Sequence, residues 1–585
     1  MHPTILGLSA FYHDSAAALL HSGRTRFALQ EERITRIKFD NSFPSNAISL
    51  ALESTGITIS EIDRIAFFEN PKVKLDRILK TSSPQQLLKS LSETWDQKLH
   101  LTELIKLRTN FRGQVDYFDH HESHAAYAFF SSKAPRALVL VADGVGEWDT
   151  TSIWLGEGAT LKHISSTRFP HSLGLFYATI TSFIGFRPNS DEYKVMGLAS
   201  FGSPTHVETM RAMLRNTEHG FECDPQYYDF ESIMYSPRLT RLLGVPPRQP
   251  GVPALGVYAD IAASAQQILQ ESLLQLVIKG SAQIGIKTPV VCFGGGVALN
   301  CAAAGWLRDS GYVQDVLVPP GADDAGSAIG AAMLAHARLT GQRPDPIHTP
   351  YLGIEFTDQE AEAYIKLLGI EYECFDDATL IDHVATAITE GNIVGWFQGK
   401  SEFGPRALGN RSIFADPRPA VMRDKINEKI KHREGFRPFA PICIETNMQD
   451  WFSPAKPSPF MTSVFRSLQP DVLQAVTHVD GTARVQTIPP SPQTRTVALI
   501  NAFHAKTGIP VLLNTSFNVA EEPIVLTPFD AFNTFRESKL DILVLGNCII
   551  HRHRQDTKIM QAGTYKYMSI ARPLVPLTRS TYFFT

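Results

Sequence analysis

Short apolar runs separated by polar turns recur along the first part of the chain, a pattern typical of β-strands joined by tight connections. The stretch TILGLSAFYHDSAAALL, from Thr4, contains an apolar run to Ser9, a polar turn around His13 and Asp14, and a second apolar run. RTRFALQEE continues it as a third strand. ALVLVADGVGEWDTTSIWLG, from Ala137, repeats the order of strand, turn and returning strand. The two segments indicate a duplicated unit.

Glycine-rich and alanine-rich segments add helices to this pattern. PVVCFGGGVALN predicts a strand followed by a tight turn, and VPPGADDAGSAIGAAMLAHARL predicts a turn that leads into an alanine-rich helix. In a doubly wound α/β sheet, such turns gather at the carboxyl ends of the strands, where ligands bind. The proline-containing stretch from Thr340 to Gly353 is typical of a linker. We therefore predict an α/β protein with domains over residues 1–350 and 351–585.

Composition limits the kinds of partner. The 585 residues are 43% hydrophobic and 19% charged, which suits a globular protein, and the net charge of −4 gives no long-range attraction to nucleic acid or membranes. The longest apolar window is broken by three glycines and Asn300, so it predicts no membrane span. The six cysteines lack CxxC spacing, which argues against a disulfide framework or a zinc ribbon. The N-terminus does not resemble a signal peptide. We expect a cytoplasmic protein with a small-molecule partner.

The stretch DHHESHAAYAF, from Asp119, is the first candidate for metal chemistry. His120 and His124 are four residues apart, which places both imidazoles on one face of a helix. Asp119 followed by Glu122 resembles a capping box, so the helix is predicted to begin at His120. A single histidine is more often a surface or core residue than a ligand. A transition metal also needs three or four ligands, so further ligands must come from elsewhere in the chain.

Two aspartates and a glycine run are ambiguous when their spacing alone is considered. Asp143 ends an apolar strand, where it is either an ordinary turn residue or a side chain presented to a ligand. Asp324 begins the alanine-rich helix and could serve only as its cap. The GGGVALN turn could let a backbone approach a nucleotide or could simply be a tight connection. It matches neither the GxGxxG nor the Walker A pattern.

Cationic side chains cluster in the C-terminal part, interleaved with glycine, proline and phenylalanine. Exposed solvated charge is the usual explanation of such residues, but these do not form a polar helix face. Guanidinium groups bind phosphate oxygens in pairs, and lysine adds a mobile charge. The pattern favours a polyphosphate site built from Arg406, Arg411, Arg418, Lys431, Arg433 and Arg437, with Ser516 and Asn518 as neutral donors.

Nine motifs together give a resemblance that covers nearly the whole chain. They are YHDSAAALL, EERITRIKFDNSFP, DHHESHAA, DGVGE, EYKVMGLASFG, FGGGVALN, EFGPRALGNRSI, KHREGFRPFAP and LNTSFN. In this order they closely resemble the NodU/CmcH family of O-carbamoyltransferases, which includes antibiotic-tailoring enzymes. The N-terminal part is similar to the duplicated actin and sugar-kinase fold, and the C-terminal part is similar to YrdC-like α/β adenylating domains.

The resemblance implies roles for individual residues. It implies a metal site of His120, His124, Asp143 and Asp324, holding Fe²⁺ or another divalent ion, with His121 as a bystander. It implies catalytic or substrate-contacting roles for His13 and Lys38. Carbamoyl-adenylate in the N-terminal domain would contact Gly144, Gly294, Gly295, Gly296 and Asn300. ATP and carbamoyl phosphate in the C-terminal domain would contact Arg406, Lys431, Arg433, Arg437, Arg484, Asn514, Ser516 and Asn518.

The implied chemistry has two steps. The C-terminal domain would form carbamoyl-adenylate from carbamoyl phosphate and ATP, with Mg²⁺ accompanying the nucleotide. The N-terminal domain would then transfer the carbamoyl group to a hydroxyl of a small natural product, with His13 acting as a neutral general base. The acceptor itself stays unidentified, because the segments 67–107 and 205–253 have no interpretable pattern.

Three other functions stay open. A tRNA threonylcarbamoyl-type transferase would suit a basic RNA-binding face, which the net acidity disfavours. A sugar kinase would leave the C-terminal cation cluster unexplained. A non-catalytic nucleotide-binding module would bind ATP without releasing pyrophosphate. A homodimer is also left open.

Overall fold

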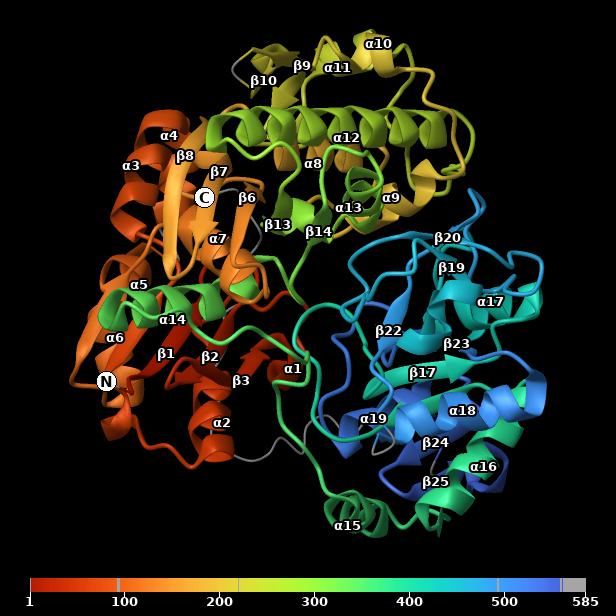
Figure 1. Ribbon diagram of the computed structural model, residues 1–585. Helices are drawn as coiled ribbons and strands as arrows, with labels where there is room; N and C mark the ends of the chain where they lie inside the picture. Colours follow the sequence, from red (N-terminus) through yellow and green to blue (C-terminus); the bar gives the residue numbers. More distant parts are fainter. Residues whose placement is uncertain (1, 92–94, 219, 492–493, 558–559, 561–585) are drawn as a thin grey trace. The chain divides into compact units, whose positions relative to one another are not determined.

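The computed structural model describes residues 2–91, 95–218, 220–491, 494–557 and 560 (Figure 1). As far as these residues go, the chain divides into two compact units. Of the described residues, the first unit contains those within 2–31 and 39–348, and the second contains those within 32–38 and 349–560. The short segment Glu32–Lys38 was predicted within the N-terminal domain, whereas its contacts place it in the second unit.

The first unit contains two five-stranded sheets with the same topology. Counted along the chain, the first strand of each sheet pairs antiparallel with the second strand and parallel with the fourth. The fifth strand pairs parallel with the fourth at the edge of the sheet. One sheet has the order β3-β2-β1-β4-β5, from β1 (Thr4–Ser9), β2 (Ala16–His21), β3 (Arg24–Gln30), β4 (Arg64–Phe67) and β5 (Gln114–Tyr117). The other has the order β8-β7-β6-β13-β14, from β6 (Arg136–Ala142), β7 (Asp149–Glu157), β8 (Thr160–Arg168), β13 (Val290–Gly294) and β14 (Asp315–Leu317).

Two helices pack between these sheets. The helix α7 (His120–Phe130) contacts β6 and β13, and α14 (Asp324–Thr340) contacts β1, β2 and α7. Alanine and glycine make this close packing possible. A Cβ atom added at Gly330 would lie 2.0 Å from the carbonyl oxygen of Ser123, so α14 can approach α7 only because this residue lacks a side chain. The predicted alanine-rich helix is therefore present, and its small residues bring its first turn close to α7.

Further elements of the first unit surround this centre. The 28-residue helix α12 (Val257–Ile284) contacts β6, β7 and β8, and short helices connect β4 to β5. The remaining elements are α2 (Ser45–Thr55), α3 (Pro71–Thr81), α4 (Pro84–Leu91), α5 (Trp95–Leu99), α6 (Leu101–Thr109), α8 (Leu173–Phe183), α9 (Glu192–Ala199), α10 (Val207–Met210), β9 (Leu214–Thr217), β10 (Gly220–Cys223), β11 (Tyr228–Asp229), β12 (Met234–Tyr235), α11 (Pro237–Leu243) and α13 (Cys301–Arg308).

The second unit is built on a mixed eight-stranded sheet in the order β15-β25-β24-β16-β17-β23-β18-β22. Its strands are β15 (Glu373–Cys374), β16 (Val394–Phe397), β17 (Arg411–Ala415), β18 (Ala440–Ile444), β22 (Gln486–Ile488), β23 (Val511–Ser516), β24 (Ile542–Leu545) and β25 (Cys548–His551). The other elements are α1 (Glu32–Thr35), α15 (Asp358–Leu368), α16 (Asp377–Thr389), α17 (Ala420–Ile426), β19 (Phe452–Ser453), β20 (Phe465–Ser467), β21 (Thr482–Ala483), α18 (Arg495–Thr507) and α19 (Pro528–Glu537). One large apolar core joins the sheet to α15, α16, α17, α18 and α19.

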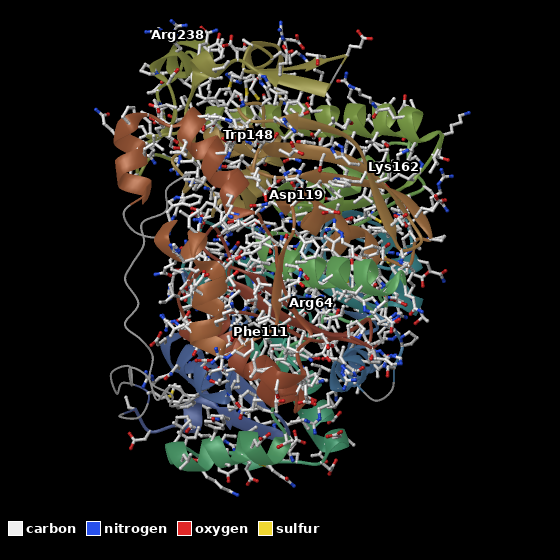
Figure 2. All side chains as sticks on the ribbon, turned by 90° about the vertical axis from the view of Figure 1, so that its left-hand side faces the viewer. Arg64, Phe111, Asp119, Trp148, Lys162 and Arg238 are labelled. Atoms are coloured by element: carbon white, nitrogen blue, oxygen red, sulfur yellow. A yellow bond between two sulfur atoms is a disulfide. The ribbon has the colours of Figure 1, made fainter. Side chains whose placement is uncertain are left out.

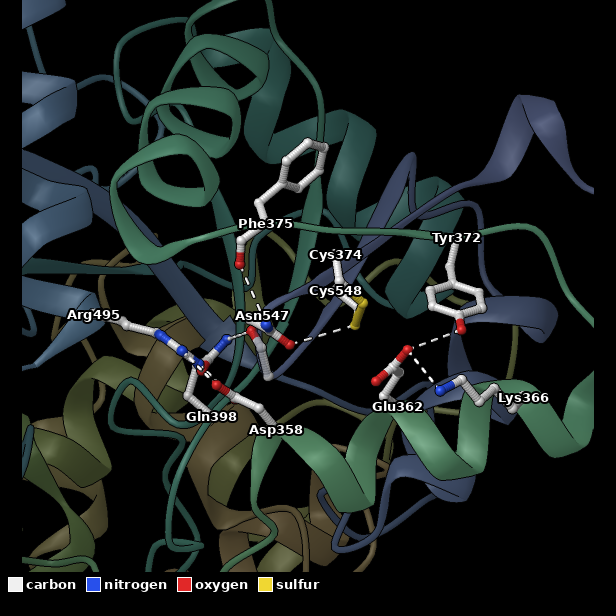
Figure 3. Close-up of a disulfide and its surroundings, with 11 residues drawn as sticks. Asp358, Glu362, Lys366, Tyr372, Cys374, Phe375, Gln398, Arg495, Asn547 and Cys548 are labelled. Carbon is white, nitrogen blue, oxygen red and sulfur yellow. Dashed lines mark hydrogen bonds and ion pairs between the residues drawn. A yellow bond between two sulfur atoms is a disulfide. The ribbon is translucent and has the colours of Figure 1, made fainter.

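Cys374 and Cys548 form a disulfide, which the cysteine spacing did not predict (Figure 3). The two residues lie opposite each other where β15 pairs antiparallel with β25, although 174 positions separate them in the chain. Such a non-local pairing leaves no spacing signal of the CxxC kind. The four other cysteines are buried and unbonded. None of the helices that the structure describes is long and apolar enough to cross a membrane.

Candidate metal centre and nucleotide site

The helix α7 begins where its sequence predicts. The side chain of Asp119, labelled in Figure 2, accepts a hydrogen bond of 3.1 Å from the backbone N–H of Glu122, so Asp119 caps the helix and His120 is its first residue. Only half of the predicted capping box is present. The carboxylate of Glu122 pairs with Arg338 of α14 and thereby connects the two helices.

Four buried side chains meet at the first turns of α7 and α14: His120, His124, Asp143 and Asp324. The Nε2 atoms of the two histidines are 3.1 Å apart. The Oδ2 atom of Asp143 lies 3.1 Å and 3.7 Å from the Nε2 atoms of His120 and His124 respectively. The corresponding distances from Oδ1 of Asp324 are 3.5 Å and 3.3 Å. Four potential ligand atoms therefore surround one point.

These separations fit a coordinated divalent cation. Ligand atoms ~2.1 Å from a tetrahedral ion lie about 3.4 Å from one another, and the distances between the histidine nitrogens and the aspartate oxygens scatter around that value. Burial alone would raise the pKa of Asp143, but hydrogen bonds and charge from His120 and His124 hold it well below its ordinary value, so its carboxylate is ionised. The other carboxylate oxygen of Asp324 is buried without a hydrogen-bond partner among the described residues. The nitrogen and oxygen set suits iron, zinc or manganese.

Neighbouring groups fix the orientation of these ligands. The Nδ1 atom of His124 lies 3.0 Å from the hydroxyl of Ser327, which is three residues after Asp324 on α14. The backbone N–H of Gly296 donates to Oδ1 of Asp143 at 3.2 Å. Glu147 accepts from the backbone N–H of His120 at 3.1 Å. These contacts leave the opposite ring nitrogens and carboxylate oxygens facing the centre.

His121 lies outside the four-residue cluster, as the resemblance implied. Its Nδ1 atom is 2.9 Å from the hydroxyl of Ser152 on β7. Burial and the neighbouring imidazoles of His120 and His124 lower the pKa of His121 well below its ordinary value. A neutral imidazole that is hydrogen-bonded to a strand contributes to packing. The three histidines of α7 therefore supply only two candidate ligands.

The glycines assigned to carbamoyl-adenylate have packing reasons of their own. A Cβ at Gly295, where φ is +87°, would lie 2.3 Å from the carbonyl oxygen of Ala142, and one at Gly294 would lie 3.0 Å from the carbonyl oxygen of His124. The carbonyl of Gly144 accepts from Ser172 at 2.7 Å.

Asn300 likewise has a local role in helix capping. Its side chain caps α13 by accepting from the backbone N–H of Ala303 at 2.9 Å. It also exchanges hydrogen bonds with Gln266 at 3.1 Å and 2.9 Å. These residues build the turn beside Asp143, and their nucleotide contacts stay a prediction.

His13 does not match the neutral base that the sequence suggested. Its Nδ1 atom lies 2.9 Å from the carboxylate of Asp14, and its Nε2 atom lies 2.7 Å from the carbonyl oxygen of Asn189. Both partners accept hydrogen bonds, so the ring is best satisfied with both nitrogens protonated. Although burial lowers the pKa of His13, the charge of Asp14 dominates and raises it well above its ordinary value.

In the second unit, Lys431 binds two other predicted residues directly. It ends a π-helical turn, Asn427–Lys431, and its ammonium donates to the hydroxyl and carbonyl of Ser516, at 3.2 Å to the hydroxyl. The same ammonium donates to the carbonyl and side-chain oxygens of Asn518, at 2.9 Å and 2.8 Å. The burial of Lys431 and the charges of Arg433, Arg437 and Lys38 lower the pKa of the lysine well below its ordinary value.

Lys38 was predicted within the N-terminal domain, but it belongs to the second unit and interacts electrostatically with Lys431. Its catalytic or substrate-contacting role stays a prediction. The segment that holds Lys38 is anchored by Arg36, whose guanidinium donates to the carbonyls of Pro523 and Ile524 at 2.7 Å each. This grouping depends on tertiary contacts that the short segment itself does not reveal.

Several other C-terminal cations serve the fold. Arg411 is fully buried and donates to the carbonyls of Gln398 and Gly399, while Arg418 pairs with Asp416. Arg411 is thus occupied within the fold, whereas the place of Arg418 in a polyphosphate site stays a prediction.

The remaining predicted C-terminal residues differ in their surroundings. Asn514 is buried and bonds Gln486 and Ala407, so it joins strands and loops of the sheet. Arg433 donates to Asn427 at 2.7 Å. Arg406 and Arg484 are partly exposed, and their contacts with ATP or carbamoyl phosphate stay a prediction.

Most of the chain is similar to carbamoyltransferases. A family model described as the carbamoyltransferase N-terminus matches residues 4–333, and one described as the carbamoyltransferase C-terminus matches residues 385–552. The nodulation protein NolNO of Sinorhizobium fredii is 38% identical over 94% of this chain and 81% of its own. The 3′-hydroxymethylcephem-O-carbamoyltransferase of Amycolatopsis lactamdurans is 30% identical over 68% of this chain and 76% of its own.

An uncharacterized Synechocystis protein, sll1178, is 40% identical over 94% of this chain and 97% of its own. The protein is therefore an enzyme of the carbamoyltransferase class. It belongs to the NodU/CmcH family of carbamoyltransferases, as its motifs indicated.

Proposed function

We propose that this enzyme is an ATP-dependent O-carbamoyltransferase that makes carbamoyl-adenylate in its second unit and uses it in its first. The observation that supports this division is the separation of two unlike chemistries. The buried cluster of nitrogen and oxygen ligands lies entirely in the first unit, whereas the cations around Lys431 lie in the second. Carbamoyl transfer to a hydroxyl by way of an adenylate needs both a polyphosphate site and a site that activates a carbonyl.

The folds proposed for the two parts follow the same division. We infer that residues 1–350 form a duplicated actin and sugar-kinase-like domain, which the matching topology of its two sheets supports. Residues 351–585 would form the YrdC-like adenylating domain, with Glu32–Lys38 contributed by the N-terminal part of the chain. The inserted segment brings Lys38 to the adenylating unit.

In the adenylating step, carbamoyl phosphate would lose its phosphate to water and yield carbamate. A carbamate oxygen then attacks the α-phosphorus of Mg·ATP, and pyrophosphate leaves. Lys431, Arg433, Arg437 and Lys38 would stabilise the charge on the phosphoryl oxygens, which is the main protein contribution to such transfers. Ser516 and Asn518 hold the Lys431 ammonium in place.

In the transfer step, His120, His124, Asp143 and Asp324 would hold a divalent ion, Fe²⁺ in our proposal, which supplies Lewis-acid chemistry at the carbamoyl group. The turn at Gly294–Gly296 would lie against the adenylate. The acceptor hydroxyl loses its proton as its oxygen attacks the carbamoyl carbon, and AMP leaves.

His13 is the residue that we assign to receive this proton. It can act as a base only after its Nε2 proton has left and the bond to the Asn189 carbonyl has opened. If His13→Ala abolishes transfer but leaves pyrophosphate release intact, the assignment holds. If pyrophosphate release is lost as well, the assignment is wrong.

The acceptor would be a hydroxyl of a small natural product, in keeping with the name of the cephem relative. The decisive assay incubates metal-loaded protein with Mg·ATP and carbamoyl phosphate and measures pyrophosphate and carbamoyl-AMP by mass spectrometry. We expect both products from the wild type and from Lys429→Ala, which changes an exposed lysine two residues away. Lys431→Ala should form neither. Folded wild-type protein that releases no pyrophosphate would overturn the proposal.

A further inference from the structure

A cluster of buried cations lies next to the candidate metal centre, on elements that sequence patterns left uninterpreted. Lys74 and Arg77 come from α3, and Lys98 comes from α5. Their exposed fractions are 0%, 3% and 2% respectively. Lysine and arginine are almost never buried to this extent unless they are paired. Three of them in one buried place therefore need an explanation.

Among the described residues, only Lys74 of the three has an acidic partner in contact. The ammonium of Lys74 lies 2.6 Å from Oε2 of Glu69 and 3.7 Å from the centre of the Tyr12 ring. In the part of the chain that the structure describes, neither Arg77 nor Lys98 has a carboxylate within ion-pair distance. Lys98 instead lies over the ring of Trp95, at 4.8 Å from its centre.

The cluster also contains buried donors without acceptors. Nε and Nη2 of Arg77 and the indole Nε1 of Trp95 have no hydrogen-bond partner among the described residues. Water could accept these hydrogen bonds, but a neutral molecule cannot compensate the charge of two desolvated cations. An anion with several oxygen atoms would neutralise the unpaired charges and accept hydrogen bonds from the unused donors.

The cluster is directly connected to the metal ligands. Oε2 of Glu69, which pairs with Lys74, lies 3.8 Å from Nδ1 of His120. The ring of Tyr12 lies edge-on to the ring of His120, with 6.4 Å between their centres. Lys98 interacts electrostatically with Arg77, Glu69 and the ligand Asp324. An anion held by Arg77 and Lys98 would therefore belong to a molecule that reacts at the metal centre.

We propose that Arg77, Lys98 and the indole of Trp95 form an anion subsite that binds a carboxylate or phosphate group of the acceptor. The proposal rests on the transfer role assigned to the first unit and specifies its substrate class as anionic hydroxyl compounds. Lys74 remains paired with Glu69, so Arg77 and Lys98 are the two cations that the subsite offers to an anion.

Binding of inorganic phosphate to the metal-loaded full-length protein tests the subsite without any turnover. Isothermal titration would compare the wild type with Arg77→Met, Lys98→Met, Lys98→Arg and Lys80→Met. Lys80 is an exposed residue on the same helix α3 and serves as the matched control. We expect the two methionine variants at positions 77 and 98 to lose at least tenfold in phosphate affinity. Lys98→Arg and Lys80→Met should stay within about twofold of the wild type. Equal affinity in all five proteins, or no binding to the wild type, would overturn the proposal.

A second titration identifies the source of the anion. In protein saturated with AMP, phosphate binding that depends on Arg77 should persist, because the acceptor group and the nucleotide bind together. If saturation with AMP abolishes the phosphate binding that depends on Arg77, the subsite binds the phosphate of the adenylate. That result would overturn the acceptor assignment.

Thermal unfolding separates binding from a structural role. Lys98→Met removes a buried cation without an acidic partner among the described residues, so the variant should keep or raise the melting temperature of the wild type. A lower melting temperature would show that the cations are structural and would overturn the proposal. Absence of pyrophosphate in the adenylation assay would refute the proposed function and leave these binding results intact.

Discussion

At the scale of single residues, the imidazole of His124 is constrained at both nitrogens. Nε2 faces the candidate metal centre, and Nδ1 lies 3.0 Å from the hydroxyl of Ser327. Because this hydrogen bond fixes the tautomer and orientation of the ring, we expect Ser327→Ala to weaken divalent metal affinity by about 10–100-fold. Competition with a chromogenic chelator measures this change.

Ser123→Ala is the matched control for Ser327→Ala. Ser123 is also a buried serine and lies on α7, but its hydroxyl has no hydrogen-bond partner among the described residues. Its removal should leave metal affinity within about twofold of the wild type. Equal losses in the two variants would show that packing, and not the bond to His124, controls affinity.

The pH dependence of folding reports on Lys98. Burial, aided by the charges of Lys74 and Arg77 and opposed by Glu69 and Asp324, lowers the pKa of Lys98 to about 7. In the unfolded chain the same lysine titrates near its ordinary value of 10.5. Between these values the unfolded state binds more protons than the folded state, so the contribution of Lys98 to stability rises with pH.

Urea unfolding of the wild type and Lys98→Met checks this sign. The free energy of unfolding of the wild type, minus that of the variant, should increase from pH 7 to pH 10. A difference that stays constant over this range would mean that Lys98 keeps its proton in the folded protein. Phosphate binding that involves Lys98 should weaken over the same interval, because the ammonium is lost.

How far the site could be predicted differs from residue to residue. The spacing of His120 and His124 marked one face of a helix, and the resemblance added Asp143 and Asp324. Ser327 was not found, although it lies three residues after Asp324 on a predicted helix, where its side chain shares the ligand's face. Lys74 and Arg77 were invisible for another reason, since two cations three residues apart also describe an ordinary solvated helix face.

At the scale of elements, the contact between α7 and α14 determines whether the four ligands meet. Gly330 faces the carbonyl oxygen of Ser123, and a methyl group there would lie 2.0 Å from it. Gly330→Ala should therefore separate the helices, destabilise the first unit by about 1–3 kcal/mol and reduce bound metal, as measured by urea unfolding and elemental analysis.

Gly435→Ala is the control for this glycine substitution. A Cβ at Gly435 would meet no heavy atom within 4 Å, and its φ is not in the left-handed region. This variant should stay within about 0.5 kcal/mol of the wild type. If Gly330→Ala changes the free energy of unfolding as little as Gly435→Ala does, α14 can shift without cost to the site.

Element prediction succeeded where the hydrophobic pattern was local. The first hairpin, the strand before Asp143 and the alanine-rich helix follow from runs of a few residues. The membership of Glu32–Lys38 in the second unit does not, because it depends on contacts of Arg36 with Pro523 and Ile524 nearly 500 positions away. The edge strand β15 is only two residues long and is defined by its partner β25 and by a disulfide.

At the scale of the whole molecule, the two candidate sites belong to different compact units. All four candidate metal ligands lie in the first unit, and Lys431 with its partners lies in the second. A ligand that binds only the folded form of one unit stabilises that unit by about 2.7 kcal/mol when its concentration is 100 times its dissociation constant. Metal binding should therefore protect one unit against local unfolding more than the other.

Hydrogen exchange followed by mass spectrometry tests this difference along the chain. Removal of the metal with a chelator should accelerate exchange in α7 and in the first turns of α14, because repulsion and lost coordination loosen the elements that hold the ligands. Exchange in β17 and β23 should not change. Addition of Mg·ATP should slow hydrogen exchange around Lys431 in the second unit. It should leave the exchange rate in α7 unchanged. Equal effects of metal removal in both units would contradict a metal role confined to the first unit, and would instead indicate that the two units fold as one cooperative structure.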